Sequence, residues 1–372
     1  MNDLARRRDR QVYLRSHPVL FALLAATRRR GVRRIGGTVL VHGTEAYREV
    51  LTRVPLDRGA AGTTGGAGRE LSGGGTLFDQ EGAGHRDGRR AVADGLGAGG
   101  VERLRPVWRE VLARGLAPLG AGRTVDLVPL ARELAGATVC ALLDAPGDPV
   151  AVAEAAADAA AAAVRDHLPG PRRPGARRAA DEAVARLAAV LAPAAPGGSE
   201  PAALRAMLAV AAVNTTVAAL PRAAAWCADA DLWDQAADDA LRPALAGELL
   251  RVVAPSPLLP RVAAGGADLD GCPVRAGDRL VLVARHAARA HSDPPDARHP
   301  APPAVAQLVF GAGAHACPGA RLARAQLDDT LAALAPYRPT VLHARADRSA
   351  ALPGWRTLTV RATEGRAPGV ER

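Results

Sequence analysis

The chain of 372 residues contains no lysine, one isoleucine (Ile35) and few aromatic residues, which make up 3% of the sequence. Hydrophobic residues still amount to 48%, so alanine, leucine and valine must build the core. The four cysteines, Cys140, Cys227, Cys272 and Cys317, are widely spaced and form no C-x-x-C pair. This spacing argues against a structural zinc site and against a framework of disulfide bonds.

All the positive charge outside histidine comes from arginine, and the net charge at neutral pH is +10. The use of arginine in place of lysine is typical of proteins encoded by GC-rich genomes, so the number of arginines alone says little about function. The excess charge suits an acidic partner. The clusters at 6–8, 28–30 and 172–173 lack interleaved aromatic residues and match no groove-reading motif. We interpret them as solvated helix faces rather than a nucleic-acid surface, with an acidic electron-transfer protein as a further candidate partner.

An apolar run from Pro18 to Ala26 lies between two arginine clusters and imitates a short signal peptide. It is shorter than the roughly 20 residues that cross a bilayer, and arginines 28–30 follow it without a clear cleavage site. We therefore expect a cytoplasmic protein that makes no contact with a membrane.

Apolar spacing predicts helices over 18–30, 45–53, 101–119, 126–143, 150–166, 176–192 and 202–220. Pro221 is expected to kink or end the last of these, and Thr44 to cap the second. Strands are predicted at 32–35 and 38–41, joined at Gly36-Gly37, with a hairpin over 274–283 and a closing pair at 340–342 and 358–360. The glycine-rich segment 59–75 has no Lys-Ser/Thr after it, so we interpret it as a mobile connection rather than a phosphate loop.

The most specific motif is the stretch F-G-A-G-A-H-A-C-P-G that begins at Phe310 and contains Cys317. Cys317 follows a glycine-rich turn and precedes a helical pattern, so its sulfur is expected near a helix N-terminus, which favours a thiolate. A thiolate binds a soft metal centre. The alternative is a buried free cysteine in a glycine-containing turn.

The spacing of Phe310, Gly313, His315, Cys317 and Gly319 resembles the haem-binding loop of the cytochrome P450 family. The resemblance implies haem b, with Cys317 as the proximal ligand of the iron. It also implies one mainly helical domain over 1–372 with a small β-rich lobe and no fused reductase.

Further matches to the family follow in chain order. His85 and Arg89 resemble its pair of haem-propionate ligands, although without the resemblance they fit a solvent-facing basic turn. Arg261 stands where the family places another propionate-binding arginine. Glu248 and Arg251 match its structural Glu-x-x-Arg pair, to which Arg298 is a candidate third member.

The helix 202–220 carries Asn214, Thr215 and Thr216 within an otherwise apolar stretch. Threonines in a helix often bond back to the preceding turn. In the family, this position holds an acid–threonine pair that delivers protons, and Thr215 keeps the match. Asn214 replaces the acid, and Ala212 replaces the usual glycine. An amide cannot gain or lose a proton near neutral pH, so proton delivery through residue 214 is in doubt.

The implied function is oxidation of a specialised metabolite such as a peptide or polyketide, as in antibiotic biosynthesis. The enzyme would be a monomer that uses dioxygen and electrons from a ferredoxin and its reductase. Asn214 raises the prospect of an atypical reaction, such as oxidative decarboxylation or carbon–carbon coupling. A catalytically silent haem-fold protein that recruits a partner enzyme is the alternative.

Overall fold

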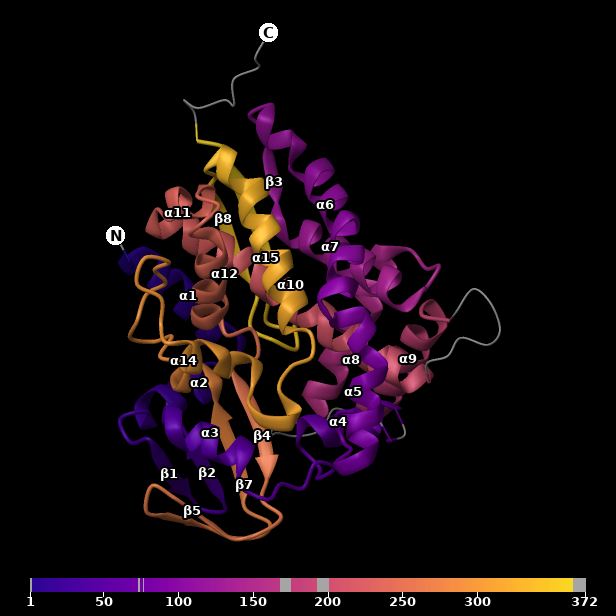
Figure 1. The fold of residues 1–372 in the computed structure, drawn as a ribbon, viewed down its shortest axis with the longest axis vertical. Coiled ribbons are helices and arrows are strands. Elements are labelled where there is room, and N and C mark those ends of the chain that lie inside the picture. The colour runs from indigo at the N-terminus through magenta and orange to yellow at the C-terminus, as the bar shows by residue number, and fades with distance from the viewer. Residues whose placement is uncertain (1, 73, 76, 168–174, 193–200, 364–372) are drawn as a thin grey trace.

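The computed structural model describes residues 2–72, 74–75, 77–167, 175–192 and 201–363 (Figure 1). The predicted arginine cluster at 172–173 lies outside these residues. Most of the described chain is helical, as the resemblance implied. The helices are α1 (Asn2–Ser16), α2 (Pro18–Thr27), α3 (Thr44–Thr52), α4 (Thr64–Ser72), α5 (Gly82–Leu96), α6 (Ala98–Gly120), α7 (Leu127–Leu143), α8 (Pro149–His167), α9 (Ala176–Val190), α10 (Ala202–Ala230), α11 (Trp233–Ala237), α12 (Arg242–Val253), α13 (Ala284–Ala287), α14 (Pro303–Ala306) and α15 (Ala320–Leu334).

The long helix α10 forms the centre of the helical body and packs against α1, α7, α8, α12 and α15 (Figure 1). It passes through Pro221 without ending, so the predicted end at 220 is wrong. Pro221 is buried among leucines of α6 and α7, and this packing offsets the hydrogen bond that proline cannot donate. Within the described residues, α10 is long and apolar enough to cross a membrane, but it is mostly buried as a core helix.

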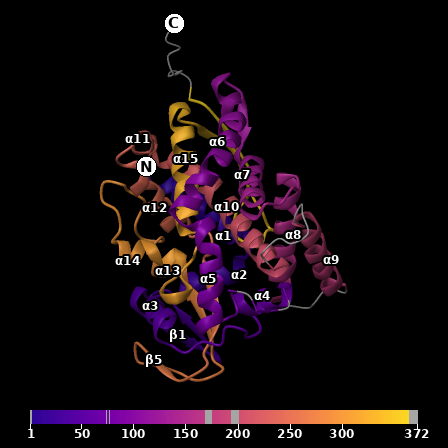
Figure 2. The ribbon, with the colours of Figure 1, turned by 45° about the vertical axis from the view of Figure 1, so that its right-hand side comes forward.

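A small β-rich lobe lies below the helical body (Figure 2). Its main sheet has the order β1-β2-β7-β4, in which β2 and β7 run parallel and the other neighbours antiparallel. Leu40 and Val283 of this sheet pack against α2, whereas Val39 and Val41 face the core that contains α3. The strands are β1 (Val32–Ile35), β2 (Thr38–Val41), β3 (Thr124–Asp126), β4 (Leu258–Val262), β5 (Ala267–Leu269), β6 (Cys272–Val274), β7 (Arg279–Val283), β8 (Thr340–Ala346) and β9 (Trp355–Arg361).

Two local predictions in this lobe are wrong. The segment 274–283 is not a hairpin, because β6 pairs with β5 while β7 joins the main sheet. Asp278 turns the chain between them by accepting a hydrogen bond from the Arg275 N–H. Thr44 does not cap α3, since its hydroxyl donates instead to the Ala287 carbonyl at 2.8 Å.

The glycine-rich segment is also more ordered than predicted, because residues 64–72 form α4. A Cβ atom at Gly65 would collide with the Arg58 carbonyl, and one at Gly66 with the Ala60 carbonyl. The glycines therefore permit close backbone contact rather than a free connection. This contact places α4 beside α10 and β4, and β4 carries Arg261.

Candidate haem-thiolate site

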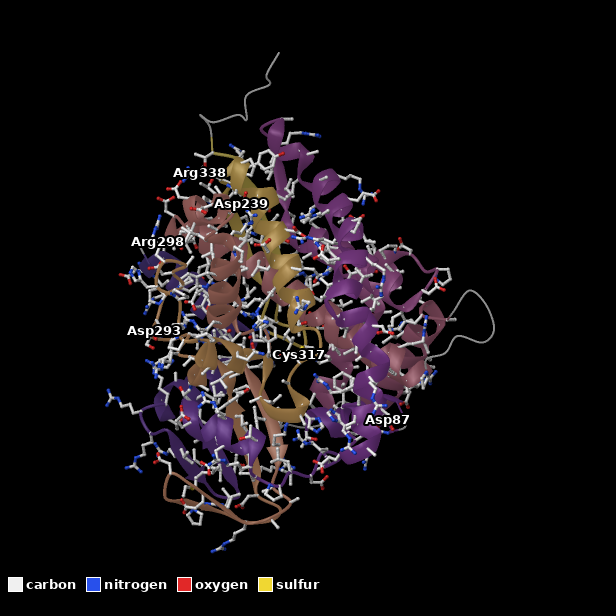
Figure 3. All side chains as sticks on the ribbon, in the orientation of Figure 1. Asp87, Asp239, Asp293, Arg298, Cys317 and Arg338 are labelled. Atoms are coloured by element: carbon white, nitrogen blue, oxygen red, sulfur yellow. The ribbon has the colours of Figure 1, made fainter. Side chains whose placement is uncertain are left out.

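The loop before α15 is folded so that Cys317 lies three residues before the helix. Gly311 and Gly313 have φ angles of 77° and 71°, which residues with a side chain rarely adopt. The Cys317 N–H donates to the Phe310 carbonyl at 2.7 Å, closing the loop on itself. A Cβ atom on Gly313 would lie 3.1 Å from the Leu51 carbonyl oxygen, so the loop also packs tightly on α3. Figure 3 shows Cys317 near the middle of the molecule.

The Cys317 side chain is exposed, yet protein atoms crowd its sulfur on most sides. Burial raises the pKa of the thiol, and a backbone hydrogen bond from Gly319 with the charges of Arg89 and Arg324 only partly opposes this. Burial therefore opposes the thiolate that the nearby helix terminus favours. A metal ion bound at the sulfur would lower the pKa of this thiol.

Arg324 is a neighbour of this loop that the motif did not reveal. Its guanidinium lies 4.6 Å from the centre of the Phe310 ring and donates to the Gln307 side chain at 2.7 Å. Its position about one turn into the helix that follows Cys317 is the sequence signal that could have identified it.

A cluster of positive groups adjoins the loop. His85 of α5 stacks on His315, with ring centres 3.8 Å apart. Arg89, one turn later on α5, donates to the Ala316 carbonyl. Arg261 of β4 donates to the Thr64 hydroxyl at 3.2 Å, and Arg58 also contributes charge to the group. The structure thus brings three predicted cofactor ligands together with the cysteine loop.

The cluster is short of negative charge. Burial, then Arg58, lowers the pKa of Arg261 to about 10. Burial and the neighbouring cations lower the pKa of His315 to about 3, and burial followed by Arg89 lowers that of His85. Glu81 pairs with Arg58 at 3.2 Å but is exposed. Groups arranged in this way favour a bound anion.

Two buried nitrogen atoms of the cluster, His85 Nε2 and Arg261 Nε, have no hydrogen-bond partner in the described structure. Arg261 Nε is a donor, and His85 Nε2 is one in the tautomer that carries its proton there. Buried donors left unpaired are costly, and the two carboxylates of haem would satisfy both. Within the described residues, no group of three or more histidine, cysteine or acidic side chains is placed to hold a metal ion by itself. Haem iron, which is held by the porphyrin and needs only one sulfur ligand from the protein, fits this arrangement.

The polar residues of α10 make other contacts. The Thr215 hydroxyl donates to the Ala211 carbonyl at 2.8 Å, which is the hydrogen bond to the preceding helical turn that threonines often make. The Asn214 amide donates to the Val210 carbonyl at 2.8 Å and to the Ala156 carbonyl of α8 at 3.3 Å. These bonds hold Asn214 and Thr215 to helices, not to the cationic cluster.

Thr216 joins α10 to α15 through a buried polar chain that the sequence did not reveal. Its hydroxyl donates to Gln326 Oε1 at 3.4 Å. Gln326 Nε2 then donates to the Thr138 hydroxyl of α7 at 2.9 Å. The chain sets α10 against the helix that follows the cysteine.

Glu248 and Arg251 form a buried ion pair on α12, with nitrogen–oxygen distances of 2.6 and 2.9 Å. Arg251 also donates to three backbone carbonyls, and Glu248 accepts from the Ala301 N–H. Arg298 is exposed at the edge of the molecule (Figure 3), so its predicted place in this network is wrong. Backbone groups occupy that place instead.

No family model matches the chain. A stretch of 98 residues is 40% identical to the erythromycin C-12 hydroxylase of Saccharopolyspora erythraea, and it spans only 24% of that protein. Solved structures align over nearly the whole chain. P450BioI bound to an acyl carrier protein ligated to hexadec-9Z-enoic acid has a TM-score of 0.77 at 18% identity, over 95% of this chain and 100% of that one.

Two further structures agree with this match. CYP109E1 of Bacillus megaterium, in complex with testosterone, has a TM-score of 0.74 at 19% identity and covers 95% of this chain and 99% of its own. A mutant of P450 EryK with erythromycin B has a TM-score of 0.72 at 22% identity, over 96% and 99%. The mainly helical fold with a small β-rich lobe is confirmed, and the chain has the fold of the cytochromes P450.

Proposed function

We propose that the chain is a haem-thiolate monooxygenase that acts as one catalytic domain over residues 1–372. The observation that carries the proposal is the cysteine loop, which presents Cys317 beside arginines and histidines with two unpaired buried nitrogen atoms, within a chain that has the cytochrome P450 fold. In this proposal Cys317 binds the iron of haem b. His85, Arg89, Arg261 and His315 bind its propionates. Phe310, Gly313 and Gly319 shape the loop.

Bound haem supplies the iron at which dioxygen is reduced and an oxygen atom passes to substrate. The Gly319 N–H stabilises charge on the Cys317 sulfur. The Thr215 hydroxyl donates its hydrogen bond to the Ala211 carbonyl. The lone pairs of its oxygen are therefore free to accept a hydrogen bond from a water molecule. Thr215 thereby orients a proton-bearing water on the face of α10.

Asn214 supplies no proton in this scheme, because its amide cannot ionise and its N–H groups are bonded to carbonyls. A proton must come through water, or from an acid in the substrate. A substrate that carries a carboxylic acid would bring such a proton, so oxidative decarboxylation also suits the site, and carbon–carbon coupling remains a further candidate reaction.

The substrate we propose is a specialised metabolite, free or carried on a protein. The 98-residue match to an erythromycin hydroxylase and the fold shared with P450BioI bound to an acyl carrier protein support this class. We further propose that the enzyme is a cytoplasmic monomer that receives electrons from a ferredoxin and its reductase. The excess of arginine suits an acidic donor.

Turnover tests the proposal. Haem-loaded protein, a surrogate ferredoxin, its reductase and NADPH are incubated with macrolides and with acyl chains on acyl carrier protein, and products are analysed by mass. We expect an oxidised product that requires both the protein and dioxygen, and a Cys317→Ser variant that gives none. A product formed equally by that variant would refute the proposal.

The alternative of a catalytically silent recruiter is favoured by the missing acid at Asn214 and by the raised pKa of the Cys317 thiol. It predicts that the protein binds haem and captures a biosynthetic enzyme, but consumes no NADPH above background with any substrate.

A further inference from the structure

Helix α2 is apolar on both of its faces. Leu20, Phe21 and Leu24 point inward and pack on the main sheet. Val19 and Leu23 point outward and are 82% and 46% exposed. The rest of the outward face is alanine and proline, without one charged or polar side chain. A helix that is apolar all round is normally covered on every side, so this outer face lacks its covering.

The outward side chains form one row. Val19, Ala22, Leu23 and Ala26 follow the spacing i, i+3, i+4, i+7 and are all exposed, which places them along one side of the helix. The edge strand β1 extends the surface. Arg33 pairs with Leu40 across the sheet, so it lies on the face that α2 covers.

Ile35 lies on the same face as Arg33, two residues further along the strand, and is 42% exposed. We define the α2 surface as the outward row with Arg28, Arg29, Arg30, Arg33 and Ile35.

The α2 surface is strongly positive. Arg28, Arg29 and Arg30 directly follow the helix and are exposed, and no ion pair involves them or Arg33 among the residues that the structure describes. The first 35 residues hold ten arginines against two aspartates. Arg8 and Arg34 are paired with acids elsewhere, so the four surface arginines carry the charge that matters here. One of these aspartates, Asp9, is buried with Arg222 and does not offset the surface charge.

We propose that the α2 surface is a docking site for an anionic lipid bilayer, on which α2 lies in the plane of the headgroups. A row of exposed aliphatic side chains bordered by arginines offers such an interface a hydrophobic contact and an electrostatic one. A helix of ten residues is about 15 Å long, half of the hydrocarbon core, so it lies on the membrane without crossing it. This departs from the expectation of no membrane contact.

A second copy or an acidic protein fits the surface less well. Protein interfaces are enriched in aromatic residues and methionine, whereas the outward row contains only valine, leucine and alanine. A helix packed on the outside of a sheet also presents a convex surface. A deformable layer of headgroups can follow a convex surface more easily than the rigid surface of a protein partner can. The proposal does not depend on haem or on turnover.

Co-sedimentation of the purified full chain with vesicles tests the proposal. We expect binding to vesicles of phosphatidylcholine and phosphatidylglycerol in equal parts, and none to phosphatidylcholine alone. Raising the salt from about 0.05 M to about 0.5 M should weaken it strongly. Arg28→Gln, Arg29→Gln and Arg30→Gln together should weaken binding about 100-fold, because each cation near an anionic surface contributes about fivefold.

Val19→Ser with Leu23→Ser should weaken binding at least tenfold by removing the inserted side chains. Two matched control variants come from the β8–β9 hairpin. Leu342→Ser removes an apolar side chain that is 50% exposed, and a second variant replaces the exposed Arg345, Arg356 and Arg361 with Gln. Both should bind vesicles like the parent.

Failure to bind anionic vesicles would overturn the proposal. So would equal loss of binding in the matched controls, which would indicate net charge alone. A dimer in sedimentation velocity that Val19→Ser with Leu23→Ser converts to monomer, without any vesicle binding, would assign the surface to a second copy instead.

Discussion

Replacing Asn214 with aspartate restores the acid that the cytochrome P450 pattern has at this position, and the structure predicts that it harms the protein. The Asn214 amide donates to carbonyls of Val210 and Ala156 at 2.8 and 3.3 Å. An ionised carboxylate can donate to neither and would face both oxygen atoms. Two lost hydrogen bonds and an unfavourable contact amount to about 2 to 3 kcal/mol of the free energy of unfolding.

Urea unfolding of the haem-free protein, followed by circular dichroism, measures this loss. Asn214→Ala removes the same donors without adding a carboxylate, so it should cost about 1 to 2 kcal/mol, and the difference isolates the charge. Because α8 is then held less firmly to α10, we expect turnover and the ratio of product to NADPH to fall. An Asn214→Asp variant of parental stability, with turnover unchanged or higher, would show that proton supply and not the link to α8 governs this position.

Three further predictions rest on charge. Burial lowers the pKa of His42 to about 4 and of His286 to about 2. Both histidines bind a proton in the unfolded chain from about pH 6.5 downward but stay neutral in the folded protein, so the free energy of unfolding should fall by about 2 kcal/mol between pH 7.5 and 5 after allowance for screening. Urea unfolding of a variant with Asn at both positions should show a weaker dependence of this free energy on pH. Glu248→Gln leaves a buried guanidinium unpaired and should cost 3 kcal/mol or more, whereas Arg178→Gln, which breaks an exposed pair, should stay within about 0.5 kcal/mol; equal effects would contradict the structural role. Arg261→Leu removes a buried cation without a counter-charge, so thermal melting should show a more stable haem-free protein while haem titration shows about tenfold weaker binding; loss of both would indicate a packing role only.

Local patterns predicted local structure well. Strands β1 and β2 end where their apolar run and glycine turn indicated, and Glu248 and Arg251 meet on one face of α12. The cysteine loop folds as a turn before a helix, and glycines stand at the two positions where this turn needs a positive φ angle. Each of these features depends on residues close together in the sequence.

The wrong predictions involve contacts between distant segments. Pro221 stays inside a helix because leucines of α6 and α7 surround it. The glycines of α4 signal close backbone packing, which composition does not distinguish from a flexible linker. The pKa of the Cys317 thiol is raised because protein atoms surround the sulfur, although the residue as a whole is exposed. Sequence spacing carries no information on burial of this kind.

The reduced carbon-monoxide difference spectrum of the haem-loaded protein tests the central claim most directly, measured beside Cys317→Ser and, as a control for the mutated thiol, Cys272→Ser. We expect a thiolate-type Soret band in the parent and in Cys272→Ser, and its loss in Cys317→Ser. A parent that binds no haem, or a thiolate band that persists without Cys317, would contradict the assignment of Cys317 as the ligand of the iron.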